Sequence, residues 1–113
     1  MGKSFAKDET PIRRKLTFSN PELVSMLCGE HNAHLQLLEE KIGLSIHMRG
    51  NDLTLEGGDW EVELAEKVLN QLYGLIKNKY PVYSNDVGYA IRILSKDPSC
   101  DLGKIFNAFV EFI

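Results

Sequence analysis

Apolar and polar residues follow two spacings along the chain, one typical of strands and one typical of helices. Alternation with period two in residues 14–19 (RKLTFS) and 44–49 (LSIHMR) predicts two half-buried strands. The turn-forming residues 50–52 (GND) follow the second strand, and LTLE at 53–56 alternates again. We therefore expect residues 44–56 to form a β-hairpin.

Four other segments carry apolar residues three and four positions apart, the spacing of a helix that buries one face. They are bounded by residues that start or stop helices: Asn20 and Gly29, Asn32 and Gly43, Asp59 and Pro81, and Ser84 and Pro98. We expect Asn20, Asn32 and Ser84 to act as N-caps.

The predicted order is strand, helix, helix, strand, strand and helix, followed by an appended helix. Elements mixed in this way predict an α+β fold, in which a three-stranded antiparallel sheet packs against helices. A chain of 113 residues supports one hydrophobic core. The last segment (KIFNAFVEFI, residues 104–113) is strongly apolar, so we expect it to dock, to continue into a following domain or to drive self-association.

Charge is distributed unevenly along the chain, whose net charge is −3. Residues 1–17 carry five basic and two acidic side chains, residues 18–66 carry two and ten, and residues 67–113 carry six and four. Because a nucleic-acid-binding surface is normally basic, the acidic middle of the chain disfavours binding there.

The two cysteines, Cys28 and Cys100, follow neither a disulfide framework nor a metal-binding spacing. We therefore expect reduced thiols and a cytoplasmic location. No apolar run reaches the length of a membrane span, and the first residues lack the apolar core of a signal peptide. These features predict a soluble protein without a membrane partner.

The helix–helix turn, Gly29-Glu30-His31-Asn32, stands where KH domains of the eukaryotic type carry Gly-x-x-Gly, and the predicted order of elements over residues 14–80 is also that of this fold. The longer pattern FSNPELVSMLCGEHNAHLQLLEEKIGLSIHMRGNDLTLEGG, followed by VELAEKVLNQLYGLI and VGYAIRIL, resembles the N-terminal region of PhoH-like proteins. These are bacterial cytoplasmic ATPases associated with phosphate starvation and RNA metabolism, in which a KH-like domain precedes a P-loop ATPase domain.

The resemblance implies a domain plan for the chain. We expect a flexible tail over residues 1–12, a KH-like domain over 13–80, an appended helix over 81–97 and the start of a linker to an ATPase domain over 98–113. The sequence contains no Walker string G-x-x-x-x-G-K-[ST], and Gly103-Lys104 is followed by isoleucine. This chain is therefore not expected to be an enzyme by itself. ATP and Mg²⁺ are implied only for a longer parent protein.

The resemblance also implies an RNA site. Backbone amides of Gly29, Glu30, His31 and Asn32 would grip the nucleic-acid backbone. Ile46, His47 and Arg49 on the second strand would contact bases. Arg13, Arg14 and Lys15 on the first strand would attract RNA by charge.

Two features of the turn favour a different function. Asn32 replaces the second glycine, and Glu30 adds a carboxylate where RNA-binding KH turns usually carry a basic residue. The turn is then a tight connector that needs glycine for positive φ. Residues 13–15 are then a solvated strand edge that discourages aggregation. The alternative function is a protein-interaction or oligomerisation module that keeps the KH shape and does not bind RNA.

Other candidate chemistry is weak. Cys28, His31 and His34 are spaced three apart, but a structural zinc site needs a fourth ligand, so we expect no metal site. The simpler interpretation is a buried thiol beside two surface histidines. No catalytic residue is expected. Trp60 precedes the apolar stripe of the long helix and is expected to pack rather than to stack on a ligand.

Overall fold

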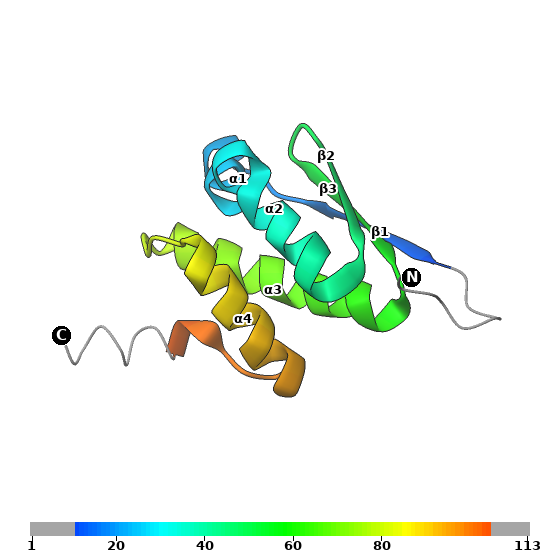
Figure 1. The fold of residues 1–113 in the computed structure, drawn as a ribbon. Helices are drawn as coiled ribbons and strands as arrows, with labels where there is room; N and C mark the ends of the chain where they lie inside the picture. The colour runs from blue at the N-terminus through cyan, green and yellow to red at the C-terminus, as the bar shows by residue number, and fades with distance from the viewer. Residues whose placement is uncertain (1–10, 105–113) are drawn as a thin grey trace.

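The structure is a computed structural model that describes residues 11–104 (Figure 1). It contains three strands and four labelled helices, namely β1 (Ile12–Thr17), α1 (Pro21–Cys28), α2 (Ala33–Leu38), β2 (Ser45–Arg49), β3 (Asp52–Gly57), α3 (Asp59–Lys77) and α4 (Ser84–Lys96). A 3₁₀ turn over Glu30–Asn32 precedes α2, and a π-helical turn over Glu39–Gly43 follows it. The predicted elements are all present.

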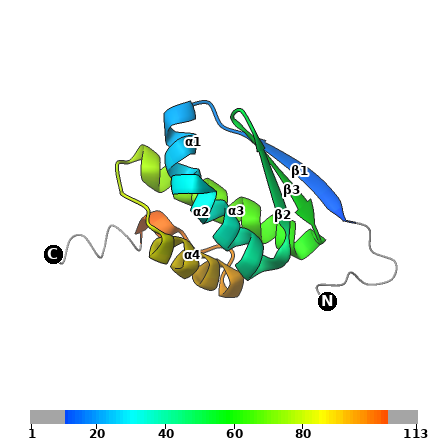
Figure 2. The ribbon, with the colours of Figure 1, turned by 45° about the horizontal axis from the view of Figure 1, so that its top comes forward.

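The three strands form one antiparallel sheet with the order β1-β3-β2. In the register, Leu16 lies opposite Leu53 and Ile46 lies opposite Leu55, so one face of the sheet is apolar. Figure 2 shows the sheet along one side of the molecule with the helices on the other. The α+β class is confirmed, with a KH-like order of elements and an additional C-terminal helix.

The core is built around α3, which contacts β1 and β3 on one side and α1 and α4 on others. Its buried residues include the whole stripe that the spacing predicts, and Leu64 is buried as well: Val62, Leu64, Ala65, Val68, Leu69, Leu72, Leu75 and Ile76. Tyr73 of this helix stacks on Phe18 with ring centroids 4.4 Å apart. Within residues 11–104, no helix combines the length and the apolar character that a membrane crossing requires.

One of the three predicted N-caps is confirmed. The Asn20 side chain accepts hydrogen bonds from two amides of the first turn of α1, at 2.9 and 3.3 Å. Asn32 instead takes a left-handed conformation, and its side chain makes no capping bond. Ser84 is already inside α4; Tyr83 precedes it, and the Tyr83 amide donates to the Asp86 carboxylate at 2.9 Å. The Asp86 carboxylate, in the first turn of α4, therefore accepts the hydrogen bond of the backbone amide that precedes the helix.

The ends of the predicted domain plan lie mostly outside the described residues, which exclude 1–10 and 105–113. At the start, Ile12 pairs with Gly57, so β1 begins two residues earlier than the alternation predicted. At the other end, the Gln71 side chain bonds the Cys100 carbonyl oxygen at 2.6 Å and the Leu102 amide at 2.8 Å. Leu102 is fully buried, so the described part of the segment expected to be a linker packs on α3.

Candidate nucleic-acid interface

The helix–helix turn uses its amides within the protein. The Gly29 amide donates to the Ser25 carbonyl oxygen at 3.1 Å, and the Asn32 amide donates to the Gly29 carbonyl oxygen at 3.0 Å. Three of the four residues in the turn have positive φ: Gly29 at 82°, His31 at 55° and Asn32 at 58°. A phosphate clamp needs amides that point outward together. At least two of the four amides here already have partners.

Gly29 has a packing role that the sequence did not reveal. A Cβ at this position would lie 2.8 Å from Cγ and Cδ2 of His34, so the ring occupies the space that the glycine leaves. Nδ1 of His34 lies 3.0 Å from the Leu27 carbonyl oxygen, within hydrogen-bond distance. The prediction of two surface histidines is therefore wrong for His34, which is 6% exposed, and correct for His31.

The strand predicted to contact bases, β2, packs one of its candidate residues into the core of the protein. Ile46 belongs to the apolar face of the sheet and is buried, so it does not present a surface to a base. Its amide donates to the Glu39 carboxylate at 2.8 Å, which ties the end of the α2 region to the edge strand. Sγ of Cys28 lies 3.3 Å from Sδ of Met48 and links α1 to the same strand.

The open face of the sheet brings together candidates from both edge strands. Residues that lie side by side across β1, β3 and β2 form three polar rows on this face: Arg13, Glu56 and Ser45; Lys15, Thr54 and His47; and Thr17, Asp52 and Arg49. We call these nine residues the polar sheet face. A shallow hollow of about 700 Å³ lies over it and is lined by eight residues, seven of them from the polar sheet face.

Charge on the polar sheet face is mixed but basic in sum. Arg13 pairs with Glu56 at 3.4 Å and Lys15 pairs with Asp52 at 3.7 Å. Both pairs are long and exposed, and exposed pairs are typically worth less than about 1 kcal/mol, so a phosphate can replace the carboxylate as partner. Among residues 11–104, Arg49 makes no side-chain ion pair, which leaves one guanidinium for a ligand.

Arg14 does not belong to this face, although the sequence placed it in one basic cluster with its neighbours. Strand alternation turns it to the helical side, where its guanidinium pairs with the Glu66 carboxylate of α3. That hydrogen bond and charge raise the pKa of Arg14. The role of Arg14 is to hold β1 on α3. Of the basic cluster at residues 13–15, Arg13 and Lys15 are left on the polar sheet face for a ligand.

The candidate metal residues are not arranged as a metal site. His34 is held at Leu27, His31 points to solvent and Cys28 faces Met48. Burial raises the pKa of the Cys28 thiol, so the thiolate that a metal prefers is disfavoured. Within residues 11–104 no three side chains of histidine, cysteine, aspartate or glutamate gather closely enough to hold an ion.

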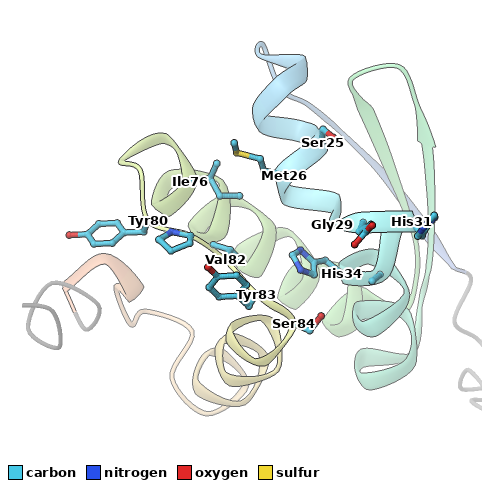
Figure 3. Close-up of a pocket in the computed structure, with 13 residues that line it drawn as sticks. Ser25, Met26, Gly29, His31, His34, Ile76, Tyr80, Val82, Tyr83 and Ser84 are labelled. Carbon is cyan, nitrogen blue, oxygen red and sulfur yellow. The ribbon is translucent and has the colours of Figure 1, made fainter. Parts of the chain in front are cut away.

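A second hollow, of about 600 Å³, lies between the helix–helix turn and the loop from α3 to α4 (Figure 3). Figure 3 shows His34 and Tyr83 on facing sides of it, with Met26 and Ile76 along another wall. Met26 is 59% exposed and Tyr83 is 66% exposed. The turn therefore borders an apolar surface, which sequence reasoning missed because residues 80–84 come from a loop distant in sequence.

Comparisons with known proteins agree with the resemblance. The chain is similar to a PhoH-like protein of Bacillus subtilis (strain 168), with 31% identity over 78 residues, covering 69% of this chain and 24% of the relative. PhoH-like proteins of Mycobacterium tuberculosis (strain H37Rv) and Mycobacterium leprae (strain TN) match over 74 residues at 31% and 28% identity, each covering 66% of this chain and 21% of the relative.

The chain thus spans about a quarter or less of the length of these curated relatives. No family model matches the chain. No solved structure matches it either. Over about two thirds of its residues, in a region whose fold has the KH-like order, the chain belongs to the PhoH-like protein family.

Proposed function

We propose that this domain binds single-stranded RNA through the polar sheet face, as an accessory module of a PhoH-like protein. The observation that carries the proposal is the sheet register, which places Arg13 and Lys15 of β1 on the same face as His47 and Arg49 of β2, all four lining one hollow. The polar rows also include Ser45 and Thr54, whose hydroxyl groups can donate to phosphate oxygens, whereas the Thr17 hydroxyl already donates to the Asp52 carboxylate at 2.8 Å.

The proposed binding is weak and depends mainly on charge. Three permanent cations, Arg13, Lys15 and Arg49, would each contact one phosphate, so log K should fall with log salt with a slope of about −2. The nine residues of the polar sheet face include no phenylalanine, tyrosine or tryptophan, and His47 carries the one aromatic ring among them, so base stacking would add little.

The proposal is tested by the fluorescence anisotropy of a labelled random 12-nucleotide RNA at low and high salt. Lys15→Gln and Arg49→Gln should each weaken binding and each reduce the salt slope by about 0.7. Arg92→Gln is the matched control, because it removes one exposed cation from α4, away from the sheet. Equal losses in all three variants would refute a specific role of the polar sheet face.

The same assay distinguishes the sheet from the turn. If the turn held RNA, Glu30→Gln would raise the affinity markedly, because it removes a carboxylate from the phosphate's path. If RNA lies on the sheet, this variant changes the affinity no more than a distant charge does. Gly29→Asp is unsuitable, because any side chain at Gly29 collides with His34 and perturbs the fold.

A second candidate function is self-association of two copies of the chain through the hollow beside the turn. The observation that favours it is the exposure of Met26 and Tyr83 at the hollow's rim, since aromatic residues and methionine are enriched in interfaces. A sedimentation coefficient that rises with concentration and is lowered by Met26→Glu, together with a flat RNA titration, would establish this function instead.

In a longer parent protein we place the ATPase step outside the residues described here. The matched relatives extend over about four times the length that aligns with this chain. ATP and Mg²⁺ would bind in such a further region, and this domain would offer RNA or a regulatory partner to it. A cytoplasmic location is part of the proposal, since Cys28 and Cys100 are free thiols.

A further inference from the structure

Trp60 is exposed, contrary to the packing role expected from its position. It lies in the first turn of α3 and is 58% exposed. A hollow of about 470 Å³ beside it is lined by Trp60 and three carboxylates, Asp59, Glu61 and Glu63. A second, smaller hollow continues from Trp60 over Leu64 and Leu94 to Pro98, which follows the end of α4, and Glu63 and Lys67 line it as well. We call Asp59, Trp60, Glu61, Glu63 and Pro98 the Trp60 patch.

The chemistry of the Trp60 patch selects a cationic partner. An indole face attracts ammonium and guanidinium groups, and neighbouring carboxylates add to that attraction. Two cations offset the negative charge of the patch in part. Lys67 lies at its edge, and Arg14 interacts electrostatically with Asp59 and Glu63, although its guanidinium is already paired with Glu66. Phosphates would be repelled, so this patch is distinct from the polar sheet face in the ligand it suits.

The chain itself carries a segment of the required kind. Residues 3–7 read Lys-Ser-Phe-Ala-Lys, with two cations flanking an aromatic ring. Ile12 pairs with Gly57, only three residues before Trp60, so β1 starts beside the patch. The seven residue steps from Phe5 to Ile12 can span up to about 23 Å, which exceeds one strand spacing of about 5 Å plus the three residue steps from Gly57 to Trp60.

We propose that residues 3–7 of the chain dock on its own Trp60 patch, with Lys3 and Lys7 against the carboxylates of Asp59 and Glu63 and Phe5 against the indole. The patch is then a docking surface for a short basic–aromatic segment, covered in cis. A tether of this length gives an effective concentration in the millimolar range, so weak contacts suffice to populate the docked state.

The chain has one tryptophan, so its fluorescence reports on this patch alone. Acrylamide quenching of the 1–113 chain is compared with that of a chain lacking residues 1–9 and with Lys3→Glu/Lys7→Glu. We expect both changes to raise the quenching constant about two-fold, as expected if the tethered segment covers the indole for about half the time. High salt should remove most of the difference. Lys77→Glu/Arg92→Glu is the matched control, with the same change of net charge elsewhere, and should quench like the parent.

Circular dichroism and the thermal midpoint establish that each variant is folded. If truncation perturbs β1, the variant Lys3→Glu/Lys7→Glu still tests the proposal, because it keeps the full length of the segment. Equal quenching constants in the parent and in Lys3→Glu/Lys7→Glu would overturn the proposal. So would a difference that grows with protein concentration, because the segment would then come from a second copy. A difference that is independent of concentration and closed by salt supports docking in cis.

Discussion

Replacing Gly29 by alanine tests whether the helix–helix turn is built for packing rather than for a ligand. Two costs are expected at this position. The backbone angles of φ 82° and ψ 170° lie in a region that only glycine adopts readily, at a cost of about 1–3 kcal/mol for another residue. The new Cβ would also lie 2.8 Å from the His34 ring, and overpacking of this kind costs about 1–3 kcal/mol.

The His34 ring cannot move aside freely, because it is buried and its Nδ1 is held at the Leu27 carbonyl oxygen. We therefore expect Gly29→Ala to lower the free energy of unfolding by about 3–4 kcal/mol. Since 1 kcal/mol shifts the midpoint by about 4–8 °C in a domain of this size, the thermal midpoint should fall by well over about 10 °C. Urea unfolding followed by circular dichroism measures the loss.

Two other glycines separate the causes. Gly50 has φ 61° but open space around it, so Gly50→Ala should cost only the backbone strain, about 1 kcal/mol. Gly74 lies within α3 with open space and no positive φ, so Gly74→Ala should stabilise by about 0.5–1 kcal/mol. A Gly29→Ala cost no larger than that of Gly50→Ala would refute the packing argument.

Three further predictions follow from other contacts. Burial raises the pKa of the Cys28 thiol, so the contribution of this thiol to stability is complete below the unfolded thiol pKa and is lost as the pH rises above about 8.5. Above that pH, the free energy of unfolding of the parent protein should fall more than that of Cys28→Ala. Cys28 should also be alkylated more slowly than Cys100. His31→Gly should stabilise by about 0.5–1 kcal/mol in urea unfolding, because φ is 55° at an exposed residue. Leu102→Ala should cost about 2–5 kcal/mol in the same assay, because its side chain is fully buried; no loss would mean that this segment does not pack on α3.

Local sequence patterns predicted correctly the features that depend on a single helix or strand. The alternation in β2 and the stripe of α3 gave the correct faces, and Asn20 is a cap because its side chain and its own helix suffice to make the bonds. His34 also carried a usable signal, since it stands four residues before the buried Leu38 on the same face of α2. The polarity of histidine predicts a surface position, but the Leu27 carbonyl oxygen of α1 gives the ring a buried partner.

The candidate surfaces depend on contacts between distant segments. Alternation placed His47 and Arg49 on one face, but only the order β1-β3-β2 brings Arg13 and Lys15 beside them. Trp60 stands two residues before Val62 and five before Ala65, so helical spacing places it off the buried stripe, and no element covers it within residues 11–104.

The measurement that tests the RNA proposal most directly is a titration of ¹⁵N-labelled protein with single-stranded RNA at low salt, followed by amide chemical shifts. The polar sheet face predicts the largest shifts at Lys15, His47, Arg49 and Thr54, reduced by Arg49→Gln and by salt. Residues 29–33 should change little, because amides of the turn are already bonded within the protein. Largest shifts at residues 29–33, with the sheet unchanged, would contradict the proposal and return the RNA site to the turn.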